Sequence, residues 1–319
     1  MSTATRRPLG DGRWLFQHGP IDCVILAEGR PEVVAACRER AWQRFRGVLD
    51  ELVGELPLLR TDLGSAAGAC VAPAGSIARR MVAACRPHAR DGRFITAMAA
   101  VAGSVAEELI GAFDEAGIAR ASINNGGDIA LHLGPSASFD VGVVADPAIG
   151  RAAVAVDGHF RIDAASPVRG IATSGWRGRS FSLGIADSVT VLAASASVAD
   201  AAATVIANAV DIADARIVRR PANEFRDDSD LGGRLVVRGV PALAPEAIGR
   251  ALTAGAAVAR GERTGGRIIA AVLSLQGRFL VVDADGPRAV AAAASRAFFP
   301  AADPERSFVH ADRRHAHAA

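Results

Sequence analysis

Two amino acids that often carry catalysis or phosphate binding are missing from this chain of 319 residues, which contains no lysine and no tyrosine. All 36 residues counted together as lysine and arginine are therefore arginine. The missing lysine excludes a Schiff-base amine and a P-loop lysine, and the missing tyrosine excludes a phenolic general acid. A bound phosphate would have to be neutralised by arginine, a metal ion or backbone N–H groups.

Cysteine is scarce, and several familiar motifs are absent. The chain has no CxxC pair, which disfavours a zinc ribbon or a redox dithiol. It also has no GxGxxG after a strand, no HExxH and no GxSxG, so a Rossmann dehydrogenase, a zincin and an α/β-hydrolase are poorly supported. The four cysteines are Cys23, Cys37, Cys70 and Cys85.

Charge and hydropathy give no sign of a nucleic-acid or membrane partner. The net charge is only +2, and no uninterrupted apolar run approaches the roughly 18 residues that a membrane helix needs. The first 13 residues are charged and lack the apolar core of a signal peptide. We therefore expect a soluble, cytoplasmic protein without nucleic-acid or membrane partners.

Hydrophobic periodicity predicts strands and helices that alternate irregularly, without the repeat of about 20–50 residues that marks a solenoid. Proline and glycine supply many of the expected boundaries. Helices are expected over residues 31–56, 76–85, 96–117, 197–215 and 245–260. Strands are expected over residues 14–17, 21–27, 119–124, 267–275 and 278–283, with several short strands between 129 and 192.

A polar, glycine-paired elbow separates two apolar stretches at Asn124-Asn125-Gly126-Gly127-Asp128. The two glycines permit positive φ and close backbone approach, while the neighbouring side chains offer amide and carboxylate groups at the same point. Five such residues in a row predict a binding site at the end of a strand. A plain Gly-Gly hairpin turn with solvated neighbours is the alternative.

A second group of polar side chains lies on the predicted helix that begins near Ser197. Asp200 and Thr204 are four residues apart, so their oxygens project from one helix face. Mg²⁺ takes oxygen ligands of this kind and often bridges to a phosphate. Alternatively, Ser197 and Asp200 form a capping box at the helix N-terminus, and the two roles can coexist.

A third motif is a turn of small residues after a predicted strand, Gly170 to Gly175. The hydroxyls of Thr173 and Ser174 and the backbone N–H groups of such a loop can bind phosphate oxygens. An ordinary Ser-Gly turn is the alternative.

Taken in order, these segments resemble the ApbE-like superfamily, whose best-known members are FAD:protein FMN transferases. The family's small-residue helix start is matched by residues 99–107, its Asn-x-Gly-Gly-Asp turn by 124–128, its Thr-Ser-Gly turn by 173–175, and its Ala-Asp-Ala-x-Ala-Thr helix start by 199–204. Order and spacing agree from about residue 95 to about residue 210. The Gln-His-Gly-Pro-Ile-Asp segment at 17–22, with the elbow, looks like a divergent subgroup of that superfamily.

The resemblance implies an α+β, T-fold-like architecture in which mixed or antiparallel sheets pack with helices. We expect a single large domain over residues 1–285, followed by a C-terminal helix and mobile tail over residues 286–319. It also implies Mg²⁺ and FAD as cofactors, and transfer of FMN from FAD to a Thr or Ser hydroxyl of a protein acceptor.

Carried over residue by residue, the resemblance makes Asp200 and Thr204 metal ligands, with a backbone carbonyl around Ala99 as a third. The nucleotide pocket would be lined by two groups of residues that the motifs share. These are Asn124, Asn125, Gly126, Gly127 and Asp128 from the elbow, and Thr173, Ser174 and Gly175 from the later turn.

The chain departs from the transferases at several positions. Ala102 stands where they carry a lysine, Trp176 and Arg177 replace an aromatic–acidic pair, and the stretch 181–184 lacks their histidine. The catalytic residues are therefore unassigned, and transfer activity is expected to be altered or absent. A non-catalytic binding or assembly protein and an FAD pyrophosphate hydrolase are the alternatives. The sequence indicates neither an acceptor protein nor an oligomeric state.

Overall fold

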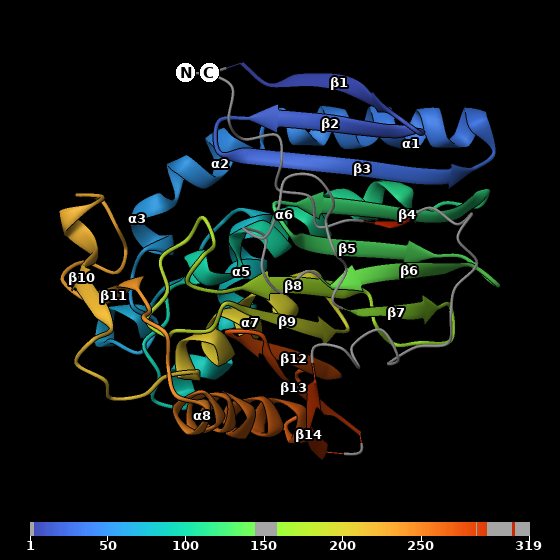
Figure 1. Ribbon diagram of the computed structural model, residues 1–319. Coiled ribbons are helices and arrows are strands. Elements are labelled where there is room, and N and C mark those ends of the chain that lie inside the picture. Colours follow the sequence, from blue (N-terminus) through green and yellow to red (C-terminus); the bar gives the residue numbers. More distant parts are fainter. Residues whose placement is uncertain (1–2, 144–157, 285, 292–307, 310–319) are drawn as a thin grey trace.

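Antiparallel strand pairing organises the chain, of which the computed structural model describes residues 3–143, 158–284, 286–291 and 308–309 (Figure 1). The strands are β1 (Thr5–Gly10), β2 (Arg13–His18), β3 (Ile21–Gly29), β4 (Ile118–Asn125), β5 (Asp128–Leu133), β6 (Ser138–Val143), β7 (Gly158–Asp163), β8 (Gly170–Ser174), β9 (Ser188–Ala193), β10 (Val218–Pro221), β11 (Leu235–Gly239), β12 (Ala270–Leu275), β13 (Arg278–Asp283), β14 (Gly286–Ala291) and β15 (Phe308–Val309).

The helices connect and cover these strands. They are α1 (Pro31–Phe45), α2 (Val48–Gly54), α3 (Leu56–Leu59), α4 (Ala66–Ala69), α5 (Ser76–Arg90), α6 (Val101–Ile110), α7 (Ala196–Ala209) and α8 (Pro245–Thr264). Short 3₁₀ turns are η1 (Ala97–Ala100), η2 (Gly111–Phe113) and η3 (Ala222–Glu224).

One sheet of ten strands runs through the molecule in the order β1-β2-β3-β4-β5-β8-β9-β12-β13-β14. Every neighbouring pair in it is antiparallel. Two smaller sheets have the orders β15-β6-β7 and β10-β11. The β15–β6 pair is parallel, so its sheet is mixed. The expected α+β class, with mixed or antiparallel sheets packed with helices, is confirmed.

Helices and the β6–β7 hairpin cover opposite faces of the central strands. Figure 1 shows α5, α6 and α7 behind the sheet, with α1 along β2 and β3 and α8 beside β12 and β13. Along β5, Ile129 and Leu131 pack against Phe139 of β6, whereas Ala130 faces the helix side. This alternation follows from the two-residue period of a strand, and it buries β5 on both faces.

Several predicted elements are corrected by the structure. The helix expected over 31–56 is two helices, α1 and α2, separated at Gly47, and a third helix, α3, begins after Glu55. The bend at Gly47 lets Phe45 and Val48 enter one hydrophobic cluster. The helix expected to reach residue 215 ends at 209, where backbone groups of the 183–185 segment bond Asn208 and Val210.

The C-terminal segment also differs from expectation. Residues 286–291, where the expected C-terminal helix would begin, form strand β14, which pairs with β13 in the main sheet. Residues 292–307 and 310–319 lie outside the described residues. By contrast, β13 has the bounds that the sequence predicts, and α8 begins at the predicted proline.

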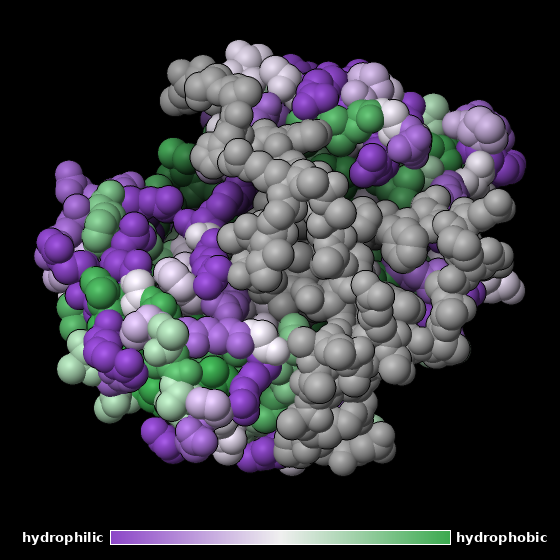
Figure 2. Space-filling view, viewed as in Figure 1, coloured by the Kyte–Doolittle hydropathy of each residue, from purple (hydrophilic) through white to green (hydrophobic). Residues whose placement is uncertain are grey.

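Exposed large apolar side chains gather at one end of the described surface. They lie on α2, α3 and the lobe that contains β10 and β11, which Figure 2 shows as green patches among purple hydrophilic residues. Arg60 at the end of α3 pairs with Asp228 of this lobe at 2.7 Å, so the two regions are adjacent. Within the described residues, no helix is both long and apolar enough to cross a bilayer. The exposed apolar residues are Val53, Leu58, Val218, Phe225 and Leu235.

Helices α6 and α7 cross at a glycine. A Cβ placed on Gly103 of α6 would lie 2.3 Å from the carbonyl oxygen of Ala196 and 2.9 Å from the Cβ of Asp200. Both distances are far below contact distance, so any side chain at this position would force the two helices apart.

We expect Gly103→Ala to destabilise the protein by about 1–3 kcal/mol, because the clash involves the backbone of α7 rather than a side chain that can move. Gly249→Ala is the matched control, since its Cβ would meet nothing within 4 Å inside α8. That change should stabilise the protein by roughly 0.5–1 kcal/mol through helix propensity. Urea denaturation of both variants measures the difference, and equal midpoints would contradict the packing argument.

Candidate functional site

The elbow is a two-residue hairpin turn whose polar neighbours are buried. Asn125 pairs with Asp128 across it, and Gly126 and Gly127 have φ of +68° and +114°. Asn124, Asn125 and Asp128 are only 6%, 3% and 9% exposed. The turn is therefore a Gly-Gly hairpin, as the alternative to a binding site predicts. Its polar neighbours, however, are buried, whereas that alternative predicts that they are solvated.

Each polar side chain of the elbow has a defined bonding partner. The Oδ1 of Asn124 accepts the N–H of Gly127 at 2.8 Å and fixes the turn. Asn125 Nδ2 donates to the carbonyl of Ala102 at 3.1 Å, and Asp128 Oδ1 accepts the N–H of Thr173 at 3.2 Å. The elbow is thus tied to the start of α6 and to the end of β8.

Asp200 joins the same group from α7. Its Oδ2 accepts the N–H of Gly103 at 2.8 Å, and the N–H of Ala102 also bonds this carboxylate. Burial raises the pKa of Asp200 well above its ordinary value, and the nearby charge of Asp128 raises it further. Two carboxylates from different elements therefore lie close together at the N-terminal end of α6.

The capping box expected from Ser197 and Asp200 does not form. Glu107 of α6 takes that role instead, because its Oε2 accepts both the N–H and the hydroxyl of Ser197, at 3.0 and 2.7 Å. Asp200 in turn caps α6. Each helix thus supplies a carboxylate to the first turn of the other, which satisfies N–H groups that a helix N-terminus leaves unbonded.

The remaining predicted site residues lie in or next to η1, α7 and β8, and both η1 and β8 pack against α7. Thr204 follows Asp200 by one turn on α7 and is half-buried, as is Ala99 in η1, which packs against α7. In a continuous α-helix the N–H of Gly103 would donate to the carbonyl of Ala99. Here the N–H of Gly103 donates to the Asp200 carboxylate instead. Ser174 ends β8, and a Cβ on Gly175 would lie 2.3 Å from the Asp187 carbonyl oxygen.

The residues that replace the family's aromatic–acidic pair bind an aspartate that sequence reasoning missed. Trp176 Nε1 donates to Asp187 Oδ1 at 3.1 Å, and Arg177 Nε lies 3.0 Å from the same oxygen. The other carboxylate oxygen accepts the N–H of Gln276 at 2.5 Å. Asp187 thus anchors the loop after β8 to the β12–β13 turn. No local pattern in the sequence marks it.

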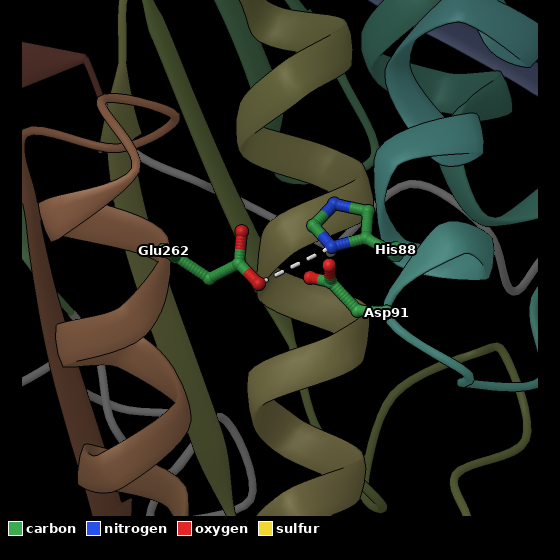
Figure 3. Close-up of side chains that lie close together, drawn as sticks. All are labelled: His88, Asp91 and Glu262. Carbon is green, nitrogen blue, oxygen red and sulfur yellow. Dashed lines mark ion pairs between the residues drawn. The ribbon is translucent and has the colours of Figure 1, made fainter.

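A separate cluster of metal-ligand residue types lies between α5 and α8 (Figure 3). His88 Nδ1 and Glu262 Oε1 are 3.3 Å apart, both side chains are 1% exposed, and Asp91 lies beside them. Arg267 binds Glu262 at 2.5 Å and Asp91 at 3.1 Å, and Arg93 binds Asp91 at 2.9 Å. A metal ion here would sit beside two guanidinium groups, so we assign the cluster as an ion-pair network.

This network has a definite pH dependence. Burial alone would raise the pKa of Glu262, but the interactions with His88 and Arg267 outweigh it and lower the pKa from 4.5 to about 2. Ionised Glu262 therefore stabilises the fold fully above about pH 4.5, and this contribution is lost as the pH falls towards 2.

We expect Glu262→Gln to lower the free energy of unfolding at pH 7 by about 1–3 kcal/mol, since Arg267 and His88 lose their charged partner. The difference in free energy of unfolding between wild type and variant should decrease as the pH falls from 4.5 to about 2. Denaturant unfolding at several pH values measures it, with the exposed Glu246→Gln on the same helix as control. A difference that stays constant with pH would refute the assignment.

Comparisons with known proteins support the resemblance drawn from the motifs. The family model described as AbpE bacteria matches residues 5–296. A UPF0280 protein of Methanopyrus kandleri is 33% identical over 223 residues, 68% of this chain and 83% of that protein. A UPF0280 protein of Methanosphaerula palustris is 40% identical over 136 residues, 42% of this chain but only 53% of its own length.

Solved structures match more distantly. A mutant of the flavin transferase ApbE from Vibrio cholerae has a TM-score of 0.42 and 12% identity, over 90% of this chain and 96% of that chain. The ApbE protein from Thermotoga maritima has a TM-score of 0.31 and 16% identity, over 81% and 74%. The family model, which spans most of the sequence, therefore carries the assignment: this chain belongs to the ApbE-like superfamily, in the family described as AbpE bacteria.

Proposed function

We propose that this protein binds a flavin nucleotide, or another phosphorylated nucleotide, together with Mg²⁺ at the start of α6. The proposal rests mainly on a pair of buried carboxyl groups, Asp128 and Asp200. They lie close enough for the charge of Asp128 to raise the pKa of Asp200. Like charges at such a point repel, and a divalent cation with oxygen ligands offsets that repulsion.

The residues present fit a hard cation. Asp200, the Thr204 hydroxyl and the Ala99 carbonyl would hold it, and all three donors are oxygens. The Ala99 carbonyl is available because Gly103 directs its N–H to Asp200. When bound, the metal would supply charge stabilisation at a pyrophosphate.

The chain's own residues would bind and orient the nucleotide. A Cβ on Gly127 would meet nothing within 4 Å, so a ligand can approach the backbone of the elbow closely there, whereas the guanidinium of Arg179 covers Gly126. Ser174 and Gly175 would present hydroxyl and N–H groups to phosphate oxygens. Thr173 would support them from β8, because its N–H donates to Asp128 and its hydroxyl lies 3.0 Å from that of Thr190. Residues 170–174, expected as a turn, form strand β8, and Asp128 would hold the elbow against the end of this strand through its bond to the N–H of Thr173.

The reaction that we propose is transfer of FMN from FAD to a Thr or Ser hydroxyl of an acceptor protein. The hydroxyl oxygen attacks the phosphorus of the FMN half, the bond to the AMP half breaks, and AMP leaves with the electron pair. The hydroxyl proton passes to a base, for which no residue is assigned. Ala102 offers no cation there, and Arg177 is paired with Asp187.

Asp200→Asn tests the binding site without changing the shape of the side chain. Its amide oxygen can still accept the N–H of Gly103, but the charge is lost. We expect wild type to quench flavin fluorescence in a saturable, Mg²⁺-dependent way, and the variant to lose at least ~10-fold in affinity with Mg²⁺ present. Exposed Asp50→Asn is the control. Absent FAD binding at high micromolar concentration would favour the non-catalytic alternative.

Product analysis separates the possible reactions. Incubation with FAD, Mg²⁺ and a candidate acceptor should release AMP and add FMN mass to the acceptor. AMP released without any flavinylated protein would show that water is the acceptor, and the protein would then be a pyrophosphate hydrolase. Mass spectrometry of protein and nucleotides distinguishes these outcomes.

A further inference from the structure

One arginine lies directly on the elbow. A Cβ on Gly126 would be 2.2 Å from Nη2 and 3.3 Å from Cζ of Arg179, so the guanidinium fits there only because residue 126 is a glycine. Arg179 reaches the elbow from the loop that follows β8. A positive charge therefore lies against the turn that the sequence marks as a binding site.

This guanidinium is only loosely paired. Within the described part of the chain its carboxylate partner is Asp22, with 3.7 Å between Nη1 and Oδ2, and 48% of the arginine side chain is exposed. Nearby Arg177, by contrast, lies 3.0 Å from an oxygen of the buried Asp187. Arg179 is therefore the cation of this loop that an incoming anion can most easily engage.

The sequence segment at residues 17–22 gains a role from this geometry. Strand β3 pairs with β4 so that Cys23 lies opposite Asn125, which brings Asp22 beside the elbow. Gln17 Nε2 donates to Asp22 Oδ1 at 2.8 Å and holds this carboxylate in place. Asp22 therefore positions Arg179 and also competes with any anion for its charge.

We propose that Arg179 binds a phosphate group of the nucleotide. Asp22 positions the guanidinium of Arg179 before binding, and the phosphate replaces Asp22 as its partner. The inference rests on the proposed function and deepens it. The carboxylate of Asp128 repels an anion at this point, and the chain has no lysine to offset it. A guanidinium presents two parallel N–H donors that match the oxygens of a phosphate.

Two opposite changes test this role. Arg179→Gln should weaken FAD binding by roughly 10-fold or more, and should reduce its salt dependence, while riboflavin, which lacks phosphate, binds as before. Asp22→Asn should strengthen FAD binding and leave riboflavin unaffected. Arg179→Lys should restore part of the loss. Arg250→Gln on the exposed side of α8 is the control, and thermal melting checks that each variant is folded.

Inorganic pyrophosphate, measured by calorimetry, separates this inference from the flavin assignment. Pyrophosphate binding that depends on Arg179 supports the inference, even if wild type fails to bind FAD and the flavin assignment is wrong. If wild type binds FAD and Arg179→Gln binds it equally tightly, the inference is wrong while the proposed function stands. If wild type binds neither FAD nor pyrophosphate, both are wrong.

Discussion

The crossing of α6 and α7 is the constraint on which the candidate site depends. Glu107 bonds the first turn of α7, and Asp200 bonds the first turn of α6, so each helix end is satisfied by the other helix. Gly103 lets the two backbones approach closely enough for both bonds to form. The same contact that joins the helices also buries the Asp200 carboxyl group beside the elbow. The packing of α6 against α7 is therefore also what raises the pKa of Asp200.

The site is therefore built from helix ends and turns rather than from one strand. The elbow supplies Asp128, α7 supplies Asp200, and the loop after β8 supplies a guanidinium. The ten-stranded sheet fixes the distances between these segments, because β4, β5 and β8 are successive neighbours in it. Two carboxyl groups meet at the start of α6, and the guanidinium of Arg179 lies on the elbow next to them.

Local signals in the sequence predicted the elements that have sharp boundaries. The bounds of β13 and the start of α8 follow from strand alternation and from a proline, and the elbow follows from its paired glycines. The bonds that assemble the site could not be predicted this way. Gly103 and Asp200 are 97 residues apart, and Ser197 and Glu107 are 90 apart, so only the fold brings them together. The mutual capping of the helices also replaced the local capping box.

The anchoring of Trp176 has an optical consequence. Its indole N–H bonds the buried Asp187, and it lies three residues before Arg179 on the same loop. The other two tryptophans belong to another region, where Trp42 packs on Phe16 and the Trp14 ring lies under Arg38. A molecule bound at this loop would thus alter the surroundings of one indole and leave the other two unchanged, so the fluorescence of Trp176 would report on its binding.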